Sequence, residues 1–278
     1  MNRNLMGAGV ALVLLCAPVW GSICTGEVRS GAETPRGELV LSQVTSCDAG
    51  AVEAEAAPAK IAPKKGVQAM LDKIHWLGHD CFRVDAEKTV YFDPFELGSG
   101  PVPADVVFVS HDHFDHCSPS DVAAVTREGT VVVTTAACAK KLKGNVKIVK
   151  PGDKLTVQGI PVEVVLAYNV DPARKQFHPR SAGGVGFIVT MGKKRIYHAG
   201  DTDFIPEMKS FKVDLAMIPV SGKYVMTAED AAKAVQAMKP EITIPMHCGS
   251  IVGSRKDAET LKKLVAPLRV EILTSEKK

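Results

Sequence analysis

The chain has 278 residues, 46% of them hydrophobic, which is enough to bury the core of one large domain or two small ones. Aromatic residues make up only 5% of the chain, and the formal net charge of +3 comes from dispersed lysines and arginines. Binding of single-stranded nucleic acid relies on stacked aromatic side chains and a basic stripe, so we expect no nucleic-acid partner.

The first residues have the pattern of a secretory signal peptide. Arg3 supplies a positive charge and residues 5–20 are almost wholly apolar, so we expect a signal peptide over residues 1–21. The expected location is therefore outside the cytoplasm, periplasmic or secreted. The apolar run is short for a membrane span, but an uncleaved N-terminal anchor stays open as a possible membrane attachment. A lipoprotein is disfavoured because the large side chain of Ile23 precedes Cys24.

The composition changes after the signal-like segment. Residues 22–68 are dominated by Ala, Glu, Gly, Pro and Lys, which predicts a flexible linker before a folded domain over residues 69–278. The chain has 7 cysteines, an odd number without a C-x-x-C pair. Cys24 and Cys47 could pair in an oxidising compartment, whereas the cysteines of the domain are expected to be small buried side chains.

Within the domain, short runs of β-branched and aromatic residues predict strands, and capped or amphipathic segments predict helices. The expected strands cover residues 73–77, 81–84, 89–92, 106–109, 131–134, 146–149, 154–157, 161–166, 186–190, 195–198, 215–218, 241–244 and 270–273. One short helix is expected to begin near residue 118. Three further helices are expected over residues 136–142, 228–238 and 257–264. Strands with helices at intervals imply sheets that are covered by helices.

The most informative segment is SHDHFDH at residues 110–116, which directly follows an apolar strand and holds three histidines and two aspartates. Side chains two residues apart in an extended chain point the same way, so His111 and His113 can bind one metal ion. Asp115 and His116 come after a turn and can bind a second. Imidazole nitrogens and carboxylate oxygens suit zinc, and also iron or manganese. A purely structural zinc site is disfavoured because such sites usually use several cysteines.

Two later strand ends carry residues of the same kind. Asp201 follows a Gly turn after the strand at residues 195–198, and it could bridge two metal ions. His247 follows the strand at residues 241–244. Each signal is weak alone, because a Gly-Asp pair is usually a simple turn. Three strand ends with metal-type ligands together predict one metal centre.

These motifs resemble the metallo-β-lactamase superfamily, through H-x-H-x-D-H, a later G-D and a late histidine. The segments WLGH (76–79), DPF (93–95), YHAGDT (197–202) and IPMH (244–247) narrow the resemblance to single-domain metal-dependent hydrolases similar to ascorbate-6-phosphate lactonase. The resemblance extends from about Ile74 to the last expected strand. It implies an α/β (α+β) fold, an αββα sandwich of two mixed β-sheets flanked by helices, with metals at one edge.

The resemblance also implies a two-metal site, with zinc expected and manganese or iron as alternatives. The implied ligands are His111 and His113 for the first metal, Asp115, His116 and His247 for the second, and Asp201 as the bridge. The implied reaction is attack of a metal-bound hydroxide on an ester, lactone or phosphodiester. The fold does not imply activity on β-lactams. An iron-dependent oxidoreductase and a non-catalytic metal-binding protein are the alternatives.

One position departs from the superfamily pattern. The superfamily usually has a further histidine between the first motif and the G-D pair, but Asn169 stands at the expected strand end. The nearest histidine is His178, in a loop. His178 is interpreted in three ways: as the third ligand of the first metal, as a contact to substrate, or as a residue of a surface loop.

Other side chains are candidates for catalysis or substrate binding. Asp115 could orient the hydroxide or assist proton transfer, in addition to binding metal. His198 is a catalytic candidate and His79 a substrate-binding candidate, in oxyanion or ligand-supporting roles, although a lone histidine is often purely structural. Lys223 and Tyr224 follow a strand and could contact substrate. A plain loop that caps the next helix is the alternative for these two residues.

The remaining expectations concern support and partners. Asp93 follows a strand and could orient a ligand histidine, as carboxylates often do around metal sites. Asp112 could instead point away from the metals and hold the loop. A small-molecule substrate is the expected partner, and a homo-oligomer remains possible from the sequence.

Overall fold

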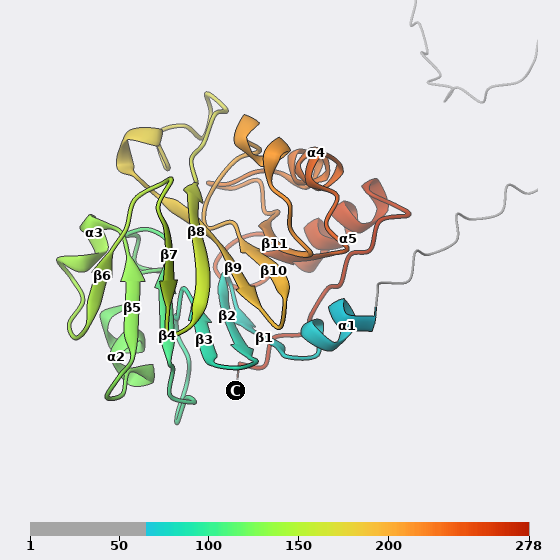
Figure 1. The fold of residues 1–278 in the computed structure, drawn as a ribbon. Helices are drawn as coiled ribbons and strands as arrows, with labels where there is room; N and C mark the ends of the chain where they lie inside the picture. The colour runs from blue at the N-terminus through green and yellow to red at the C-terminus, as the bar shows by residue number, and fades with distance from the viewer. Residues whose placement is uncertain (1–64, 278) are drawn as a thin grey trace, which may run out of the picture. The chain divides into compact units, whose positions relative to one another are not determined.

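The computed structural model describes residues 65–277 (Figure 1). The predicted signal peptide, the Cys24–Cys47 pair and nearly all of the predicted linker lie outside the described residues. Helix α1 (Lys65–Leu71) begins before the domain start that we expected at residue 69. The reason is burial, because Val67 and Met70 of α1 pack into the core with 0% and 4% of their surface exposed.

The first half of the domain forms one six-stranded sheet in chain order. Its strands are β1 (Ile74–Gly78), β2 (Cys81–Asp85), β3 (Thr89–Phe92), β4 (Val106–Val109), β5 (Val131–Thr134) and β6 (Val146–Ile148). Strands β1 to β3 pair antiparallel, whereas β3 to β6 pair parallel. The parallel strands bring their carboxyl ends to one edge of the sheet.

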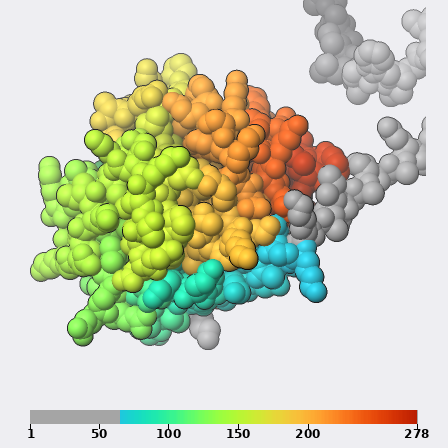
Figure 2. Space-filling view, in the orientation of Figure 1, coloured from blue at the N-terminus to red at the C-terminus, as the bar shows by residue number. Residues whose placement is uncertain are grey.

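The second half forms another six-stranded sheet, again in chain order. Its strands are β7 (Lys154–Val157), β8 (Ile160–Leu166), β9 (Val185–Met191), β10 (Lys194–His198), β11 (Leu215–Pro219) and β12 (Ile242–Met246). Strands β7 to β10 pair antiparallel and β10 to β12 pair parallel. In Figure 2 the first half, cyan to green, lies along the bottom and left of the molecule, and the second half, yellow-green to red, extends from the centre to the upper right.

Helices cover the outer faces of the two sheets. Helices α2 (Pro119–Val125) and α3 (Ala136–Ala139) flank the first sheet, and α4 (Ala228–Met238) and α5 (Arg255–Leu264) flank the second (Figure 1). Two single-turn helices, η1 (Arg180–Ala182) and η2 (Pro206–Ser210), lie in loops. The expected αββα sandwich of two mixed sheets is therefore confirmed. Among residues 65–277, no helix combines the length and apolar character that a membrane crossing requires.

Strand β4 is apolar throughout because both of its faces are buried. Val106 and Phe108 belong to the core between the sheets, while Val107 and Val109 pack in the cluster that includes residues of α2 and α3. Both faces of the strand are buried, which a continuous apolar run requires. Phe108 stacks on Phe92 at 5.2 Å and approaches Phe187 of the second sheet at 4.9 Å, so it joins the two layers.

The prediction of a strand at residues 270–273 was wrong. In this segment Val270 makes only an isolated parallel bridge to Thr243 of β12. The Thr243 N–H donates to the Arg269 carbonyl and the Glu271 N–H donates to the Thr243 carbonyl, and no further ladder bond extends the pairing within the described residues. The apolar pattern reflects burial of Val270 against the core rather than a seventh strand.

Replacement of Phe108 by alanine should lower the free energy of unfolding by about 3–5 kcal/mol, because it leaves a cavity where the two sheets meet. Urea unfolding of the full chain measures the change. The control is Phe114→Ala, since Phe114 is 71% exposed and its removal should change stability by less than about 0.5 kcal/mol. Equal effects of the two substitutions would contradict this account of the core.

Candidate metal centre

The predicted ligands come from loops at one edge of the sandwich. The segment Ser110–Cys117 follows β4, His178 lies in the loop after β8, Asp201 follows β10 and His247 follows β12. A fifth loop also reaches this edge: His79 and Asp80 form the turn that joins β1 to β2. Loops at the carboxyl ends of parallel strands share one edge of a sheet, which is where α/β proteins place their sites.

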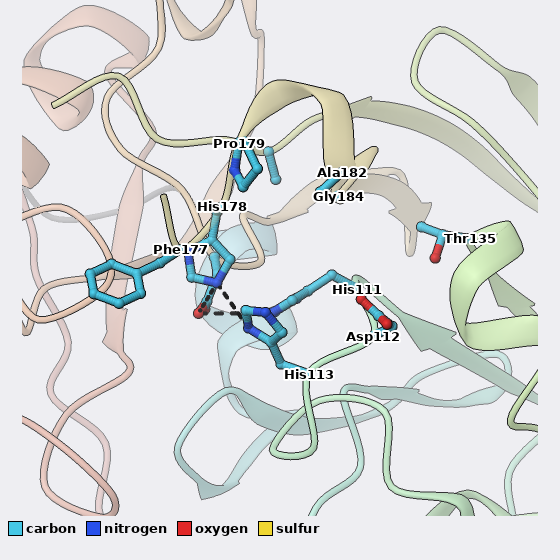
Figure 3. Close-up of a pocket in the computed structure, with 11 residues that line it drawn as sticks. His111, Asp112, His113, Thr135, Phe177, His178, Pro179, Ala182 and Gly184 are labelled. Carbon is cyan, nitrogen blue, oxygen red and sulfur yellow. Dashed lines mark hydrogen bonds and ion pairs between the residues drawn. The ribbon is translucent and has the colours of Figure 1, made fainter. Parts of the chain in front are cut away.

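The first group of donor atoms is formed by His111, His113 and His178, whose donor atoms lie within 4.8 Å of one another. His113 Nδ1 and His178 Nε2 are 3.2 Å apart, and Figure 3 shows the two rings pointing toward each other. Asp201 Oδ2 is 3.2 Å from His178 Nε2 and 3.9 Å from His111 Nε2. His178 thus folds back to the place where we had looked for a third histidine.

The second group is formed by His79, Asp80, His116 and His247, again within 4.8 Å of one another. Asp201 also faces this group, with Oδ1 3.4 Å from His116 Nε2 and Oδ2 3.3 Å from His247 Nε2. Asp201 is therefore the one carboxylate that contacts both groups among the described residues. This is the arrangement that a bridging ligand between two metal ions requires.

Hydrogen bonds fix the ring orientation of His111 and His116. Ser110 Oγ donates its single proton to Asp93 Oδ2 at 2.6 Å, so it can only accept from His111 Nδ1 at 3.0 Å. His116 Nδ1 donates to the same carboxylate at 2.8 Å. Both rings therefore carry their proton on Nδ1 and turn the lone pair of Nε2 toward the centre.

The same logic holds for His247 and His178. Ser221 Oγ donates to the Lys223 carbonyl and accepts from His247 Nδ1 at 2.9 Å. His178 Nδ1 donates to the Tyr224 carbonyl at 3.1 Å. A second hydrogen bond that fixes the tautomer of each ligand histidine is typical of metal sites.

The unsatisfied atoms test whether metal ions fit this site. His111 Nε2, His116 Nε2 and Asp201 Oδ1 are buried and have no hydrogen-bond partner among residues 65–277. Buried polar atoms are normally paired, so their convergence on one space needs a cation there. The donors are imidazole nitrogens and carboxylate oxygens, which suit divalent transition metals. The residues present therefore fit bound metal.

The charges of the metal-free site compensate one another. Burial alone would raise the pKa of Asp201, but the nearby imidazoles of His247 and His116 hold it well below its usual value. Burial would lower the pKa of His247, yet the carboxylates of Asp201 and Asp80 raise it to about 9. His111, further from these carboxylates, has its pKa lowered well below the usual value by burial.

An open cleft of about 260 Å³ lies beside the centre. Its lining residues are His113, Phe114, Asp115, Phe177, His178, Asp201, Tyr224 and His247. A smaller pocket of about 30 Å³ lies on another side of His113 and His178 (Figure 3). Tyr224 thus reaches the space that substrate would enter. Lys223 is exposed, its Nζ lies 5.4 Å from the centroid of the Tyr224 ring, and it does not line the cleft.

Two histidines that we predicted to contact substrate or take part in catalysis lie behind the site. His198 is fully buried: its Nε2 donates to the Asp80 carbonyl at 2.9 Å and its Nδ1 accepts from the Gly200 N–H. With both ring nitrogens engaged, His198 supports two loops and cannot contact substrate. His79 is 1% exposed, and its Nε2 lies 3.1 Å from Asp115 Oδ2. The geometry makes His79 a positioning residue for Asp115.

Asp115, which we predicted to be a ligand of the second metal, lies at the rim of the centre and belongs to neither group of donor atoms. Its Oδ2 is 3.8 Å from His116 Nε2, and its side chain is 14% exposed toward the cleft. Burial raises the pKa of Asp115, but the hydrogen bond from His79 and the charge of His116 outweigh burial and lower it. Asp115 is therefore ionised at neutral pH and faces both the second group of donor atoms and the cleft.

The backbone at the site is held in unusual conformations. His79, Asp93 and His247 have positive φ values of 49°, 41° and 55°. Residues with a Cβ rarely adopt this region, and such strain is concentrated at functional sites. No sequence pattern that we used predicts these angles.

Sequence reasoning missed Asp80 and the two serines that orient imidazoles, Ser110 and Ser221. Asp80 directly follows His79 in the turn after a strand, so the rule that located the other ligands at strand ends could have found it. Asp112 points away from the ligands, as expected, with Oδ2 3.1 Å from Lys141 Nζ.

Comparison with known proteins identifies the family. Residues 73–247 match the family model of the β-lactamase superfamily domain. The chain belongs to this superfamily. A UPF0173 metal-dependent hydrolase from Thermoplasma acidophilum is 33% identical over 219 residues, which cover 73% of this chain and 95% of that relative. The superfamily resemblance that the motifs indicated is confirmed, and so is the class of metal-dependent hydrolase.

Solved structures support the same fold. The crystal structure of a protein assigned as a metal-dependent hydrolase from Parabacteroides distasonis is 34% identical, with a TM-score of 0.65, covering 72% of this chain and 91% of that one. A diiron β-hydroxylase from Streptomyces venezuelae is only 15% identical, with a TM-score of 0.58, covering 72% of this chain and 52% of that one. The second likeness shows a shared fold alone.

Replacement of Asp93 by asparagine should weaken metal binding by roughly 10- to 100-fold, because the amide can no longer accept all three hydrogen bonds from Ser110 and His116. Competition with a chromophoric chelator measures the affinity. Asp105→Asn is the matched control. Asp105 directly precedes β4, at the end of the strand opposite the centre, and its carboxylate accepts a hydrogen bond from the Thr89 N–H. Equal affinity of the two variants would rule out the supporting role of Asp93.

Metal binding should release protons at neutral pH, because His247 has a pKa of about 9 in the metal-free protein and must lose its proton to bind metal. Metal affinity should therefore rise as the pH is raised toward about 9. The stability that protonated His247 adds to the metal-free protein shows the opposite trend: it is complete below about 6.5 and is lost as the pH rises through about 9. Calorimetry in buffers of different ionisation enthalpy counts the released protons, and a count of zero would contradict the charge arrangement.

Proposed function

We propose that this metal-dependent hydrolase uses two divalent metal ions, with zinc as the expected metal, to cleave an ester, lactone or phosphodiester bond of a small molecule. The observation that carries the proposal is the position of Asp201, which contacts both groups of donor atoms beside an open cleft. A pair of divalent metals lowers the pKa of bound water and polarises the oxygen of the bond to be cleaved.

The chain itself supplies the ligands and the proton acceptor. His111, His113 and His178 would hold the first metal, and His116 and His247 the second. Asp201 would lie between the two metals. Asp115 Oδ2 is ionised, fixed by His79 and open to the cleft, so it can take a proton from the attacking water.

The cleft also has features of a substrate site. Phe114 and Phe177 line it and are 71% and 38% exposed, although large apolar side chains are usually buried. The Phe177 ring packs edge-to-face on the Tyr224 ring, with 4.7 Å between the ring centroids, and both residues line the cleft. These rings favour a substrate with an apolar group next to the bond that is cleaved, and a volume of about 260 Å³ suits a small molecule.

The full chain purified without added metal should contain two metal ions, and His178→Ala should contain one and lose hydrolysis by about 100-fold or more, because removal of one ligand empties the first position. Elemental analysis gives the metal content, and a panel of lactones, phosphodiesters and a β-lactam gives the activity. Asp214→Asn is the control, since Asp214 accepts the Arg195 N–H at the start of β10, away from the centre.

Three outcomes would count against this proposal. No metal under any loading condition would favour a non-catalytic protein. Iron-rich protein that consumes oxygen but hydrolyses nothing in the panel would favour an oxidoreductase. Unchanged metal content in His178→Ala would remove His178 from the ligand set and leave it as a substrate contact.

A further inference from the structure

Asp80 is a fully buried carboxylate to which the proposed reaction assigns no role. Its side chain is 0% exposed, and both carboxylate oxygens have no hydrogen-bond partner among residues 65–277. A buried carboxylate without donors is strongly unfavourable unless a cation compensates its charge.

Three ring nitrogens of the second group lie within 4.0 Å of Asp80 Oδ2. The distances are 3.5 Å to His116 Nε2, 3.8 Å to His79 Nε2 and 4.0 Å to His247 Nε2. These separations are too long for good hydrogen bonds. Two ligands that are each about 2.1 Å from one metal lie about 3.0–3.4 Å apart. The observed separations exceed this range by up to about 0.6 Å, so the side chains would have to move inward to surround one ion.

The turn that carries Asp80 is fixed on several sides. His198 Nε2 donates to the Asp80 carbonyl, and Trp76 Nε1 donates to the His79 carbonyl at 2.9 Å. The His247 N–H donates to the same His79 carbonyl, which ties the turn directly to another ligand loop. These bonds hold the backbone of the turn in place, and the Asp80 side chain therefore starts from a fixed position beside the second group.

We propose that Asp80 is an additional ligand of the second metal position and makes the two positions chemically different. This inference rests on the proposed two-metal centre. The first position has three imidazoles and Asp201. The second has the imidazoles of His116 and His247 with a carboxylate oxygen of Asp80, next to Asp115 and Asp201.

The difference has a consequence for the metal. Imidazole-rich four-coordinate sites suit zinc, whereas sites rich in carboxylate oxygens also accommodate harder ions of higher coordination number, such as Mn²⁺. Asp80 should therefore allow the second position to bind Mn²⁺, while the first position keeps its affinity for Zn²⁺ without any contribution from Asp80.

The test compares the full-length wild type with Asp80→Asn, after removal of metal with a chelator. One equivalent of Zn²⁺ is added first and Mn²⁺ is then titrated, with bound Mn²⁺ followed by electron paramagnetic resonance and both metals counted by elemental analysis. The wild type should bind one Zn²⁺ and one Mn²⁺ per chain. Asp80→Asn should keep its Zn²⁺ and bind Mn²⁺ at least 10-fold more weakly. Asp214→Asn should match the wild type.

Each remaining outcome is decisive for one proposal. If Asp80→Asn binds Mn²⁺ as tightly as the wild type, Asp80 is not a ligand, and the two-metal centre stands without it. If the wild type binds only one metal of any kind, the two-metal proposal fails and this inference fails with it. Asp80→Ser, a smaller uncharged side chain, repeats the test if the asparagine variant does not fold. If Asp80→Asn and Asp80→Ser both lose Zn²⁺ as well as Mn²⁺, Asp80 does not act at the second position only, and the assignment is overturned.

Discussion

Four buried imidazoles keep their protons on Nδ1, and the metal centre depends on this constraint. The acceptors are Ser110 Oγ for His111, Asp93 for His116, Ser221 Oγ for His247 and the Tyr224 carbonyl for His178. Each acceptor lies in a loop and not in a regular strand. The loops must therefore be in position before the lone pairs of the Nε2 atoms can converge. The rigid sandwich beneath them provides that positioning.

The same arrangement explains how so many charged groups remain buried. Asp201 lies between imidazoles of both groups, and its negative charge raises the proton affinity of His116 and His247. Protons on these imidazoles therefore compete with metal for the same nitrogens. Metal binding displaces these protons and places positive charge beside the same carboxylates.

The sequence predicted the sandwich and most of the side chains that cluster at its edge, because both follow from patterns along the chain. Apolar strands end in loops with His or Asp, and parallel strands bring those ends together. His178 could not be assigned from spacing, because its approach depends on the loop after β8, where the Asn169 N–H donates to the His178 carbonyl. His198 was predicted as a catalytic candidate in an oxyanion or ligand-supporting role, but its two hydrogen bonds place it behind the site, and only the folded turn provides them. The bridge at Val270 in place of a strand likewise depends on tertiary pairing.

Each sheet is made by one half of the chain, yet the centre takes His111, His113 and His116 from the first half and His178, Asp201 and His247 from the second. A metal ion held between these residues ties the two halves together, as a covalent crosslink would. The last ligand follows β12, near the end of the chain, so the centre is complete only after nearly all of the domain has been synthesised and folded. A chain that crosses a membrane unfolded would carry no complete centre with it, and its metal would have to be supplied by the compartment in which it folds.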